Sequence, residues 1–401
     1  ARRVVRDRGA VRAAAIAAAL AVFAGGLGWT LFIRDVATGA GTPLDLIANH
    51  SYDNQWLTDW PYFRIPSVMG TGLLVHRATT AGLPMMVGAV LLLALAPFHF
   101  FFFPVVPLLA LAWVITAGRL RDADAPRNAA TFLAPYALAL PFVVAPALQA
   151  GGSGALRLVA LWPSAPTEGG VTGVVFFYLT NLGVPFVLAM FALLARGAPT
   201  PRFLAAWIIG LFVIPNVIVL SAVDFDMNKY FQAMWIAVAV AAAWLIRHWP
   251  RPAVAAVFAL SVGSPLLVAG WTATSNLQVI STADVAAGAW VRANTPPGAV
   301  FVTNGWVNSL TDSAGRKRLT TFGPYIANLG YHPDQRIGDV TTIFCGGDPE
   351  QSARLMRQYG AQYLIDDGPP QPCVAPVDFG ASGAFELVHD LPPLIWRLAD
   401  P

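Results

Sequence analysis

Long apolar runs constrain this chain more than any other feature of its sequence. A membrane-spanning helix needs about 20 consecutive apolar residues. Apolar residues make up 56% of the 401 residues and charged residues 12%, against about 45–50% and 25% in soluble domains. We therefore expect a polytopic α-helical membrane protein, and we exclude an ordinary soluble enzyme, a disordered chain and a nucleic-acid binder. The predicted spans are 12–33, 82–98, 99–117, 129–148, 171–195, 203–222, 230–247 and 253–272.

Basic residues in the short loops orient these spans, because cytoplasmic loops carry an excess of arginine and lysine. Two predicted spans separate each arginine-bearing loop from the next, so all three loops can be cytoplasmic. Span 253–272 then carries the rest of the chain outside. Only two of the 25 basic residues are lysines, which suggests a GC-rich bacterial genome and hence a bacterial inner membrane. The loops carry Arg119, Arg121 and Arg127, then Arg196 and Arg202, then Arg247 and Arg251.

The number of spans before residue 118 stays open. The basic stretch 2–8 should also be cytoplasmic, yet three predicted spans separate it from the loop at 118–128. Either residues 62–80 also enter the membrane, or 82–117 crosses once net, or the first segment is oriented otherwise. The prediction is a membrane domain of about eight spans over residues 1–272, with an outer loop at 34–81.

The composition changes near residue 273, where charged residues reappear, and residues 273–401 are long enough to form a separate domain. Helical patterns alternate there with short apolar strands, which predicts a small extracytoplasmic α/β domain. The predicted elements are helices at 284–294 and 349–359, strands at 299–303 and 362–365, and a terminal hairpin of 385–389 with 394–398.

The only two cysteines, Cys345 and Cys373, both fall in this C-terminal segment. Outside the cytoplasm a disulfide is permitted. The chain has no CxxC motif, and no histidine cluster lies near these cysteines, so we predict a structural disulfide in preference to a metal or redox site.

The segment from Asp224 to Phe231 concentrates charge between two predicted spans. Charges at a membrane surface are costly unless they are paired or functional. Asp224 and Asp226 can hold a divalent cation such as Mg²⁺ or Mn²⁺ through oxygen ligands, and Lys229 can bind a lipid phosphate as a point charge. The alternative is a solvated interfacial turn with an internal Asp–Lys pair.

The outer loop 34–81 mixes acidic and aromatic residues, a pattern that suits a sugar site. Asp53 and Asp59 lie among tyrosines and tryptophans, whose rings can stack on a sugar while the carboxylates bind its hydroxyls. The alternative is an interfacial aromatic belt. His76 and Arg77 follow, and an arginine at an interface can bind a phosphate head group or fix the topology.

Four motifs, in order along residues 65–401, carry a family resemblance. They are His76-Arg77 ahead of Gly82-Leu83-Pro84, then 226–231, then 289–301 with Trp290 and Pro296-Pro297, then Ala314-Gly315-Arg316 followed by the strand at 360–365 and the terminal hairpin. In these motifs the chain resembles membrane glycosyltransferases of the GT-C class. Those polytopic enzymes use polyprenyl-phosphate sugars on the outer face and often end in an extracytoplasmic domain.

The resemblance implies a hexosyl- or pentosyltransferase that moves a sugar from a polyprenyl phosphate to a glycan, lipid or protein acceptor. It implies Asp53 or Asp59 as the general base, since the family places its catalytic acid in the first outer loop. Asp224 and Asp226 would hold a metal or position the acceptor. The residues expected to bind substrate or the lipid phosphate are His76, Arg77, Asn228, Lys229 and Arg316.

A second interpretation stays open. The chain has fewer predicted spans than family members usually have, and it can correspond to only the later part of such an enzyme. It would then be a split or degenerate partner, or a non-catalytic subunit that scaffolds a larger membrane complex through its outer domain.

Overall fold

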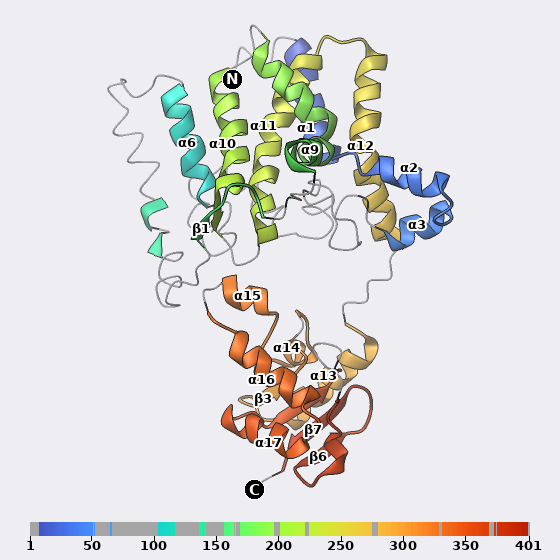
Figure 1. The fold of residues 1–401 in the computed structure, drawn as a ribbon, viewed down its shortest axis with the longest axis vertical. Helices are drawn as coiled ribbons and strands as arrows, with labels where there is room; N and C mark the ends of the chain where they lie inside the picture. The colour runs from blue at the N-terminus through green and yellow to red at the C-terminus, as the bar shows by residue number, and fades with distance from the viewer. Residues whose placement is uncertain are drawn as a thin grey trace. The chain divides into compact units, whose positions relative to one another are not determined.

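The chain forms two compact units in a computed structural model (Figure 1). Unit 1 comprises residues 1–145 and 154–275, and unit 2 comprises residues 146–153 and 276–401. The residues that the structure describes are 8–50, 52, 65, 103–116, 136–138, 140–141, 156–163, 165, 169–195, 201–220, 224–274, 280–305, 307–328, 331–368, 373 and 375–399.

Unit 1 is helical, and among its described residues three helical segments are long and apolar enough to cross a membrane: Gly170–Leu194, Asp224–Ile246 and Arg251–Thr274. They agree with the predicted spans at 171–195, 230–247 and 253–272. The predicted spans 82–98 and 129–148 lie largely outside the described residues. The helices of unit 1 are α1 (Arg8–Phe23), α2 (Trp29–Ala37), α3 (Pro43–Asn49), α6 (Val105–Thr116), α9 (Gly170–Leu194), α10 (Pro201–Val217), α11 (Asn228–Ile246) and α12 (Arg251–Thr274).

Helix α11 is the centre of unit 1, with α1, α9 and α10 packed against it (Figure 1). Its buried faces carry many alanines, which let the neighbouring backbones approach closely. The side chain of Trp235 on α11 donates a hydrogen bond from Nε1 to the carbonyl of Leu20 on α1 at 3.3 Å. The predicted span at 203–222 is shorter in the structure, because α10 ends at Val217. There β2 (Ile218–Leu220) pairs antiparallel with β1 (Leu156–Leu158).

The predicted span at 12–33 is wrong as a single helix. The chain leaves helical geometry between α1 and α2, at residues 24–28, and this unwound segment crosses a break in α9 and a proline turn of α12. We call the meeting of these three segments the glycine crossing. Apolarity alone predicted the span, but three glycines within residues 25–28 weaken the helix there.

Backbone hydrogen bonds between the three segments satisfy the polar groups that the unwound segment would otherwise leave unpaired in an apolar unit. The amide of Gly25 donates to the carbonyl of Ser261 at 2.8 Å. That carbonyl lies four residues before Pro265, which has no N–H to offer it. The amide of Leu27 donates to the carbonyl of Thr180 at 2.7 Å, three residues before the non-helical Gly183 (φ 60°) in α9. Each carbonyl lies where its own helix is interrupted, and the unwound segment supplies its donor.

Glycine is required at the crossing because the backbones touch. A Cβ on Gly26 would lie 2.5 Å from the carbonyl oxygen of Thr180, and a Cβ on Gly183 would lie 2.7 Å from that of Gly25. The hydroxyl of Ser264 adds two hydrogen bonds to the glycine crossing. It donates to the carbonyl of Gly26 at 2.9 Å and accepts from the amide of Trp29 at 3.0 Å. The side chain of Asn181 is buried beside it and accepts the amide of Ile65 at 2.9 Å.

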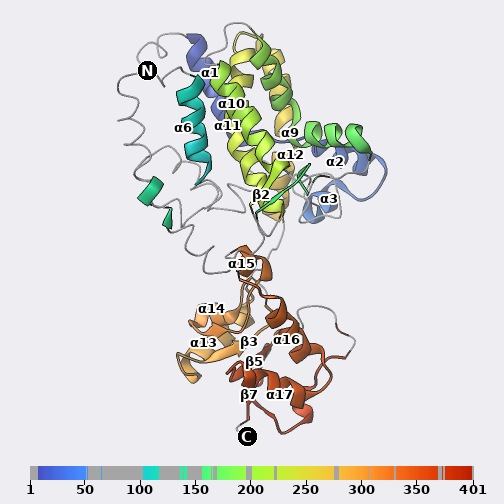
Figure 2. The same ribbon diagram turned by 60° about the vertical axis from the view of Figure 1, so that its left-hand side comes forward.

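Unit 2 is built on a five-stranded sheet in the order β4-β3-β5-β7-β6 (Figure 2). Strand β3 pairs in parallel with β4 and β5, and β7 pairs antiparallel with β5 and β6. The strands are β3 (Val300–Val302), β4 (Lys317–Arg318), β5 (Tyr363–Asp366), β6 (Phe385–His389) and β7 (Leu394–Leu398). The helices are α13 (Thr282–Asn294), α14 (Leu310–Ala314), α15 (Gly323–Asn328), α16 (Asp334–Cys345) and α17 (Pro349–Gln358). Helices α13 and α17, strands β3 and β5 and the β6–β7 hairpin agree with the elements predicted from the sequence, whereas α14, α15, α16 and β4 were not predicted.

Strand alternation divides the core of unit 2 into two layers. Phe301 and Ile365 pack with α13 and α14 on one face. Their strand neighbours Val302 and Leu364 pack with α16 and α17 on the other face, because successive side chains of a strand point to opposite sides. Helices therefore cover both faces of the sheet.

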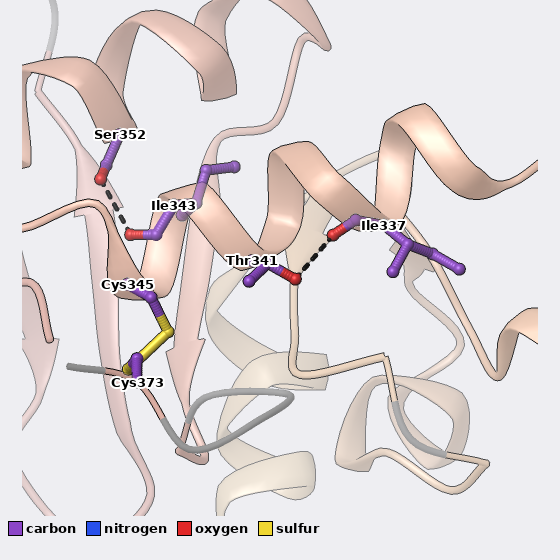
Figure 3. The surroundings of a disulfide bond; sticks show 6 residues. All are labelled: Ile337, Thr341, Ile343, Cys345, Ser352 and Cys373. Carbon is purple, nitrogen blue, oxygen red and sulfur yellow. Dashed lines mark hydrogen bonds between the residues drawn. A yellow bond between two sulfur atoms is a disulfide. The ribbon is translucent and has the colours of Figure 1, made fainter. Parts of the chain in front are cut away.

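Cys345 and Cys373 form a disulfide that joins the end of α16 to the segment ahead of β6 (Figure 3). Their Cα atoms are 5.4 Å apart. The same region is tied together by the hydroxyl of Ser352, which donates to the carbonyl of Ile343 at 2.8 Å. The hydroxyl of Thr341 donates to the carbonyl of Ile337 within α16 at 2.9 Å. A disulfide is the state expected of an extracytoplasmic domain.

Arg316 caps the C-terminal end of α13, where helix carbonyls lack helical partners. Its guanidinium donates to the carbonyls of Arg292, Thr295 and Ala314 at 2.9, 2.7 and 3.1 Å, and to the hydroxyl of Thr295 at 3.0 Å. Gly315 precedes it with a left-handed φ of 65° and ends α14. We therefore interpret the Ala314-Gly315-Arg316 motif as a structural cap, in place of the predicted substrate contact.

The cap predicts a stability effect. We expect Arg316→Ala to lower the free energy of unfolding of unit 2 by about 2 kcal/mol, because several charge-assisted hydrogen bonds are lost together. Hydrogen exchange of the α13 and α14 amides in the full chain measures it, with the exposed neighbour Lys317→Ala as the control. Equal protection in the two variants would contradict the capping role.

The glycine crossing predicts a second effect. We expect Gly26→Ala to lower the stability of unit 1 by about 2 kcal/mol or more, because the new methyl group meets fixed backbone oxygens. The matched control is Gly210→Ala on α10, where a Cβ meets nothing within 4 Å. The measurement is the midpoint of thermal unfolding of the detergent-solubilised chain. Similar midpoints in both variants would show that the crossing has room for a side chain.

Candidate functional site

One end of unit 1 gathers polar residues, and we call it the site end. Helices α11 and α12 are joined by a short connection at 247–250, so α11 begins at the end where α12 finishes. Ile47 on α3 lies against Gly270 near the end of α12, which puts α3 at the site end too. Figures 1 and 2 both show α3 and the β1–β2 pair toward this end.

The opposite end of unit 1 carries arginines. Arg12 on α1 donates a hydrogen bond from Nη2 to the carbonyl of Trp249 at 3.0 Å. The start of α1 and the 247–251 connection, with Arg247 and Arg251, therefore lie together. Arg202 at the start of α10 belongs to the same end, because α10 runs antiparallel to α11. Arg12, Arg202, Arg247 and Arg251 thus lie at the end of the helices opposite the polar clusters, whose own basic residues are each paired with a carboxylate.

The first cluster at the site end is the acidic–lysine turn, residues 224–229. It comprises the 3₁₀ turn η6 (Asp224–Met227) and the first two residues of α11. Nζ of Lys229 lies 2.5 Å from Oδ1 of Asp226, and each of these side chains is 20% exposed. The carboxylate of Asp224 is paired with Arg157 on β1. The predicted internal Asp–Lys pair is present, and Arg157 is a partner that the sequence did not indicate.

Aromatic residues support the acidic–lysine turn from inside unit 1. The fully buried Trp162 donates from Nε1 to the carbonyl of Asp224 at 2.8 Å. Its amide donates to Oδ1 of Asn216 at 3.1 Å, and its ring lies 5.3 Å from that of Phe231 on α11. Asn228 is buried, with 3% exposed, so it contributes to the packing at the start of α11. The turn is therefore anchored to the buried core of unit 1.

The predicted divalent-cation site does not fit this arrangement. Asp224 pairs with Arg157 and Asp226 pairs with Lys229, so each carboxylate already has a side-chain cation as its partner. Across the part of the chain that the structure describes, no group of three or more histidine, cysteine or acidic residues is placed to hold a metal ion.

The second cluster consists of Arg34 and Asp35 on α2 with Tyr52, and we call it the Asp35 cluster. Nε and Nη2 of Arg34 donate to Oδ1 of Asp35 at 3.1 and 2.8 Å, and the hydroxyl of Tyr52 donates to Oδ2 at 3.0 Å. Asp35 is 8% exposed and Tyr52 3%. Burial and, second, the bond to Asp35 raise the pKa of Tyr52 above its ordinary value.

Sequence reasoning missed the Asp35 cluster, although a signal was present. Arg34 and Asp35 come directly after the apolar run at 12–33, and an adjacent acid–base pair there is unusual for a lipid-facing flank. The predicted catalytic residues Asp53 and Asp59, and the predicted phosphate ligands His76 and Arg77, lie outside the described residues. The structure brings Asp224, Asp226, Asn228 and Lys229 together at the site end, while Arg316, Cys345 and Cys373 belong to unit 2.

Unit 2 has a polar group of its own where the parallel strands β3 and β5 end. Oδ1 of Asp367 accepts the amide of Asn304 at 3.1 Å. Burial raises the pKa of Asp367 to about 7, and burial also raises the pKa of its neighbour Asp366. The charges of Asp366 and Asp284 act on Asp367 in the same direction as burial.

No protein-family model matches the chain, and no curated protein sequence matches it. Function must therefore be argued from the residues and their geometry, since a fold alone does not specify it.

The raised pKa of Asp367 predicts a pH-dependent stability in unit 2. The folded state keeps its proton up to about pH 7, whereas the unfolded chain loses it near pH 4. The folded state therefore binds more protons between these values, and its stability falls as the pH rises through them. We expect a loss of about 2 kcal/mol between pH 4 and pH 8, allowing for partial exposure.

Asp367→Asn should remove this loss and raise protection of β3 and β5 against hydrogen exchange at pH 8, measured in the full chain and corrected for intrinsic rates. The exposed Asp390→Asn serves as the control. Equal protection of the two variants at pH 8 would contradict the assignment.

Proposed function

We propose that this chain is a membrane glycosyltransferase of the GT-C class, which transfers a sugar from a polyprenyl phosphate to an extracytoplasmic acceptor. The observation that carries the proposal is the Asp35 cluster. A buried carboxylate with one oxygen held by arginine stands at the same end of unit 1 as a turn that presents Lys229. Base and cation are the two groups that this transfer requires.

The charge distribution supports an extracytoplasmic site. Arg12, Arg202, Arg247 and Arg251 lie at the end of unit 1 opposite the site end, and positively charged loops stay in the cytoplasm. The two arginines at the site end, Arg34 and Arg157, are each paired with a carboxylate. The site end then faces outward in a bacterial inner membrane, where polyprenyl-phosphate sugars are used by this class. The disulfide of unit 2 fits the same side. The proposal also includes a membrane domain of about eight spans, with unit 2 as its extracytoplasmic domain.

Asp35 is the proposed general base. Its Oδ2 takes the proton of an acceptor hydroxyl while the hydroxyl oxygen attacks C1 of the sugar. The bond between C1 and the phosphate oxygen breaks, and its electron pair leaves with the polyprenyl phosphate. Both oxygens of Asp35 are held by donors, which fixes the carboxylate before the acceptor arrives.

Lys229 is the proposed partner of the leaving phosphate. A cation placed beforehand next to developing negative charge lowers the barrier without reorganisation. Its pairing with Asp226 fixes its direction, and the aromatic support around Trp162 fixes the turn. His76, Arg77 and Asn228 remain proposed donor contacts from the sequence, and Asp53 and Asp59 remain alternative bases.

An assay of the purified chain in nanodiscs tests the proposal. Polyprenyl-phosphate hexoses and pentoses are supplied with membrane glycan extract as the acceptor, and mass spectrometry measures the polyprenyl phosphate released. We expect Asp35→Asn to reduce kcat at least about 1,000-fold, because a transfer without its base loses most of its rate, and Lys229→Ala to reduce it about 100-fold. Asp45→Asn on α3 is the control, as its carboxylate accepts the hydroxyl of Thr42, the N-cap residue of that helix.

Full activity of Asp35→Asn together with loss of activity in Asp53→Asn or Asp59→Asn would move the base to the outer loop. No release of polyprenyl phosphate from any donor would overturn the proposal and favour a non-catalytic subunit. Co-purification of a stoichiometric membrane partner would then support that second interpretation.

A further inference from the structure

The hydroxyl of Tyr52 is the single described donor on the oxygen of Asp35 that arginine leaves open. Nε and Nη2 of Arg34 both donate to Oδ1, and the hydroxyl of Tyr52 donates to Oδ2 at 3.0 Å. A carboxylate oxygen accepts about two hydrogen bonds. Among the described residues, these donors fill Oδ1 and leave one position on Oδ2, where a hydroxyl proton can arrive.

The ring of Tyr52 is fixed by its neighbours. It packs edge-on against Phe32 of α2 at 5.4 Å between centroids and lies 6.1 Å from the ring of His50. Of the residues that the structure describes, Asp35 and Arg34 are the charged groups that act on its hydroxyl, and His50 is the titratable group beside its ring. Because Phe32 and Asp35 both lie on α2, this one helix determines the positions of the tyrosine ring and of the carboxylate that its hydroxyl contacts.

The backbone of Tyr52 is fixed by the glycine crossing. The carbonyl of Tyr52 lies so close to Gly28 that a Cβ there would overlap it. Gly28 ends the unwound segment that Ser261, Thr180 and Ser264 hold through hydrogen bonds. One end of the glycine crossing therefore contacts the backbone of Tyr52, whose hydroxyl is the donor on Oδ2 of Asp35.

We propose that Tyr52 is a positioning residue, seated by Gly28, that holds the open face of Oδ2 of Asp35 toward an acceptor hydroxyl. The inference rests on the proposed function, because it assigns how the base of that reaction is oriented. Tyr52 touches neither donor nor acceptor and acts through Asp35. Its loss should lower the rate of transfer and leave acceptor binding unchanged.

Tyr52→Phe in nanodiscs tests the inference, because phenylalanine keeps the ring and removes the hydroxyl. We expect kcat to fall about 10- to 100-fold, because a misplaced reacting group lowers the rate by about that factor. KM for the acceptor should stay within about twofold. The acidic limb of the kcat–pH profile should move to higher pH, because an ionised carboxylate that loses a donor is protonated more readily. The midpoint of thermal unfolding is measured for every variant.

The matched control is Tyr359→Phe, which removes a similar bond from a tyrosine hydroxyl to Asp339 in unit 2. It should leave kcat and the pH profile unchanged. If Asp35→Asn is inactive but Tyr52→Phe matches the wild type in kcat and pH profile, the positioning role is overturned and the proposed function stands. A lower kcat with an unmoved pH profile and a lower unfolding midpoint would reduce Tyr52 to a structural role. If the wild type releases no polyprenyl phosphate, the proposed function fails and this inference fails with it.

Discussion

The need to satisfy backbone polar groups inside an apolar unit shapes everything at the site end. An unwound segment in such surroundings costs several kcal/mol for each unpaired group. The glycine crossing meets this need with carbonyls beside interruptions in neighbouring helices, at Pro265 in α12 and Gly183 in α9. The chain can then turn out of α1 and begin α2 in a new direction. Arg34 and Asp35 are carried on that second helix.

The sequence predicted the three long apolar helical segments and several elements of unit 2, because composition and periodicity report burial. The apolar runs at 171–195 and 253–272 became helices α9 and α12, and the alternation in the C-terminal segment located the strands of unit 2. The break within 12–33 was not predicted, because an average of apolarity does not register where hydrogen bonds leave the helix. The glycines at 25–28 were the available signal, but their partners Thr180 and Ser261 are distant in sequence.

The site could be predicted only where its members are neighbours in the chain. Asp226 and Lys229 lie one turn apart, so their pairing followed from spacing. The contacts of Arg157 with Asp224 and of Tyr52 with Asp35 depend on tertiary structure. The same limit explains Arg316: a basic residue on an outer domain suits a phosphate, but its acceptors are helix-end carbonyls that only the folded chain assembles.

The energetics of the two clusters argue that stability is not the reason for them. A partly exposed ion pair such as Asp224–Arg157 contributes about 0–1 kcal/mol. A buried carboxylate such as Asp35 carries a desolvation cost that its arginine roughly offsets, so an apolar pair of similar volume would serve the fold as well or better. The proposed transfer, which moves a proton and releases an anion, would give these two hydrogen-bonded charge clusters a role that the needs of folding do not supply.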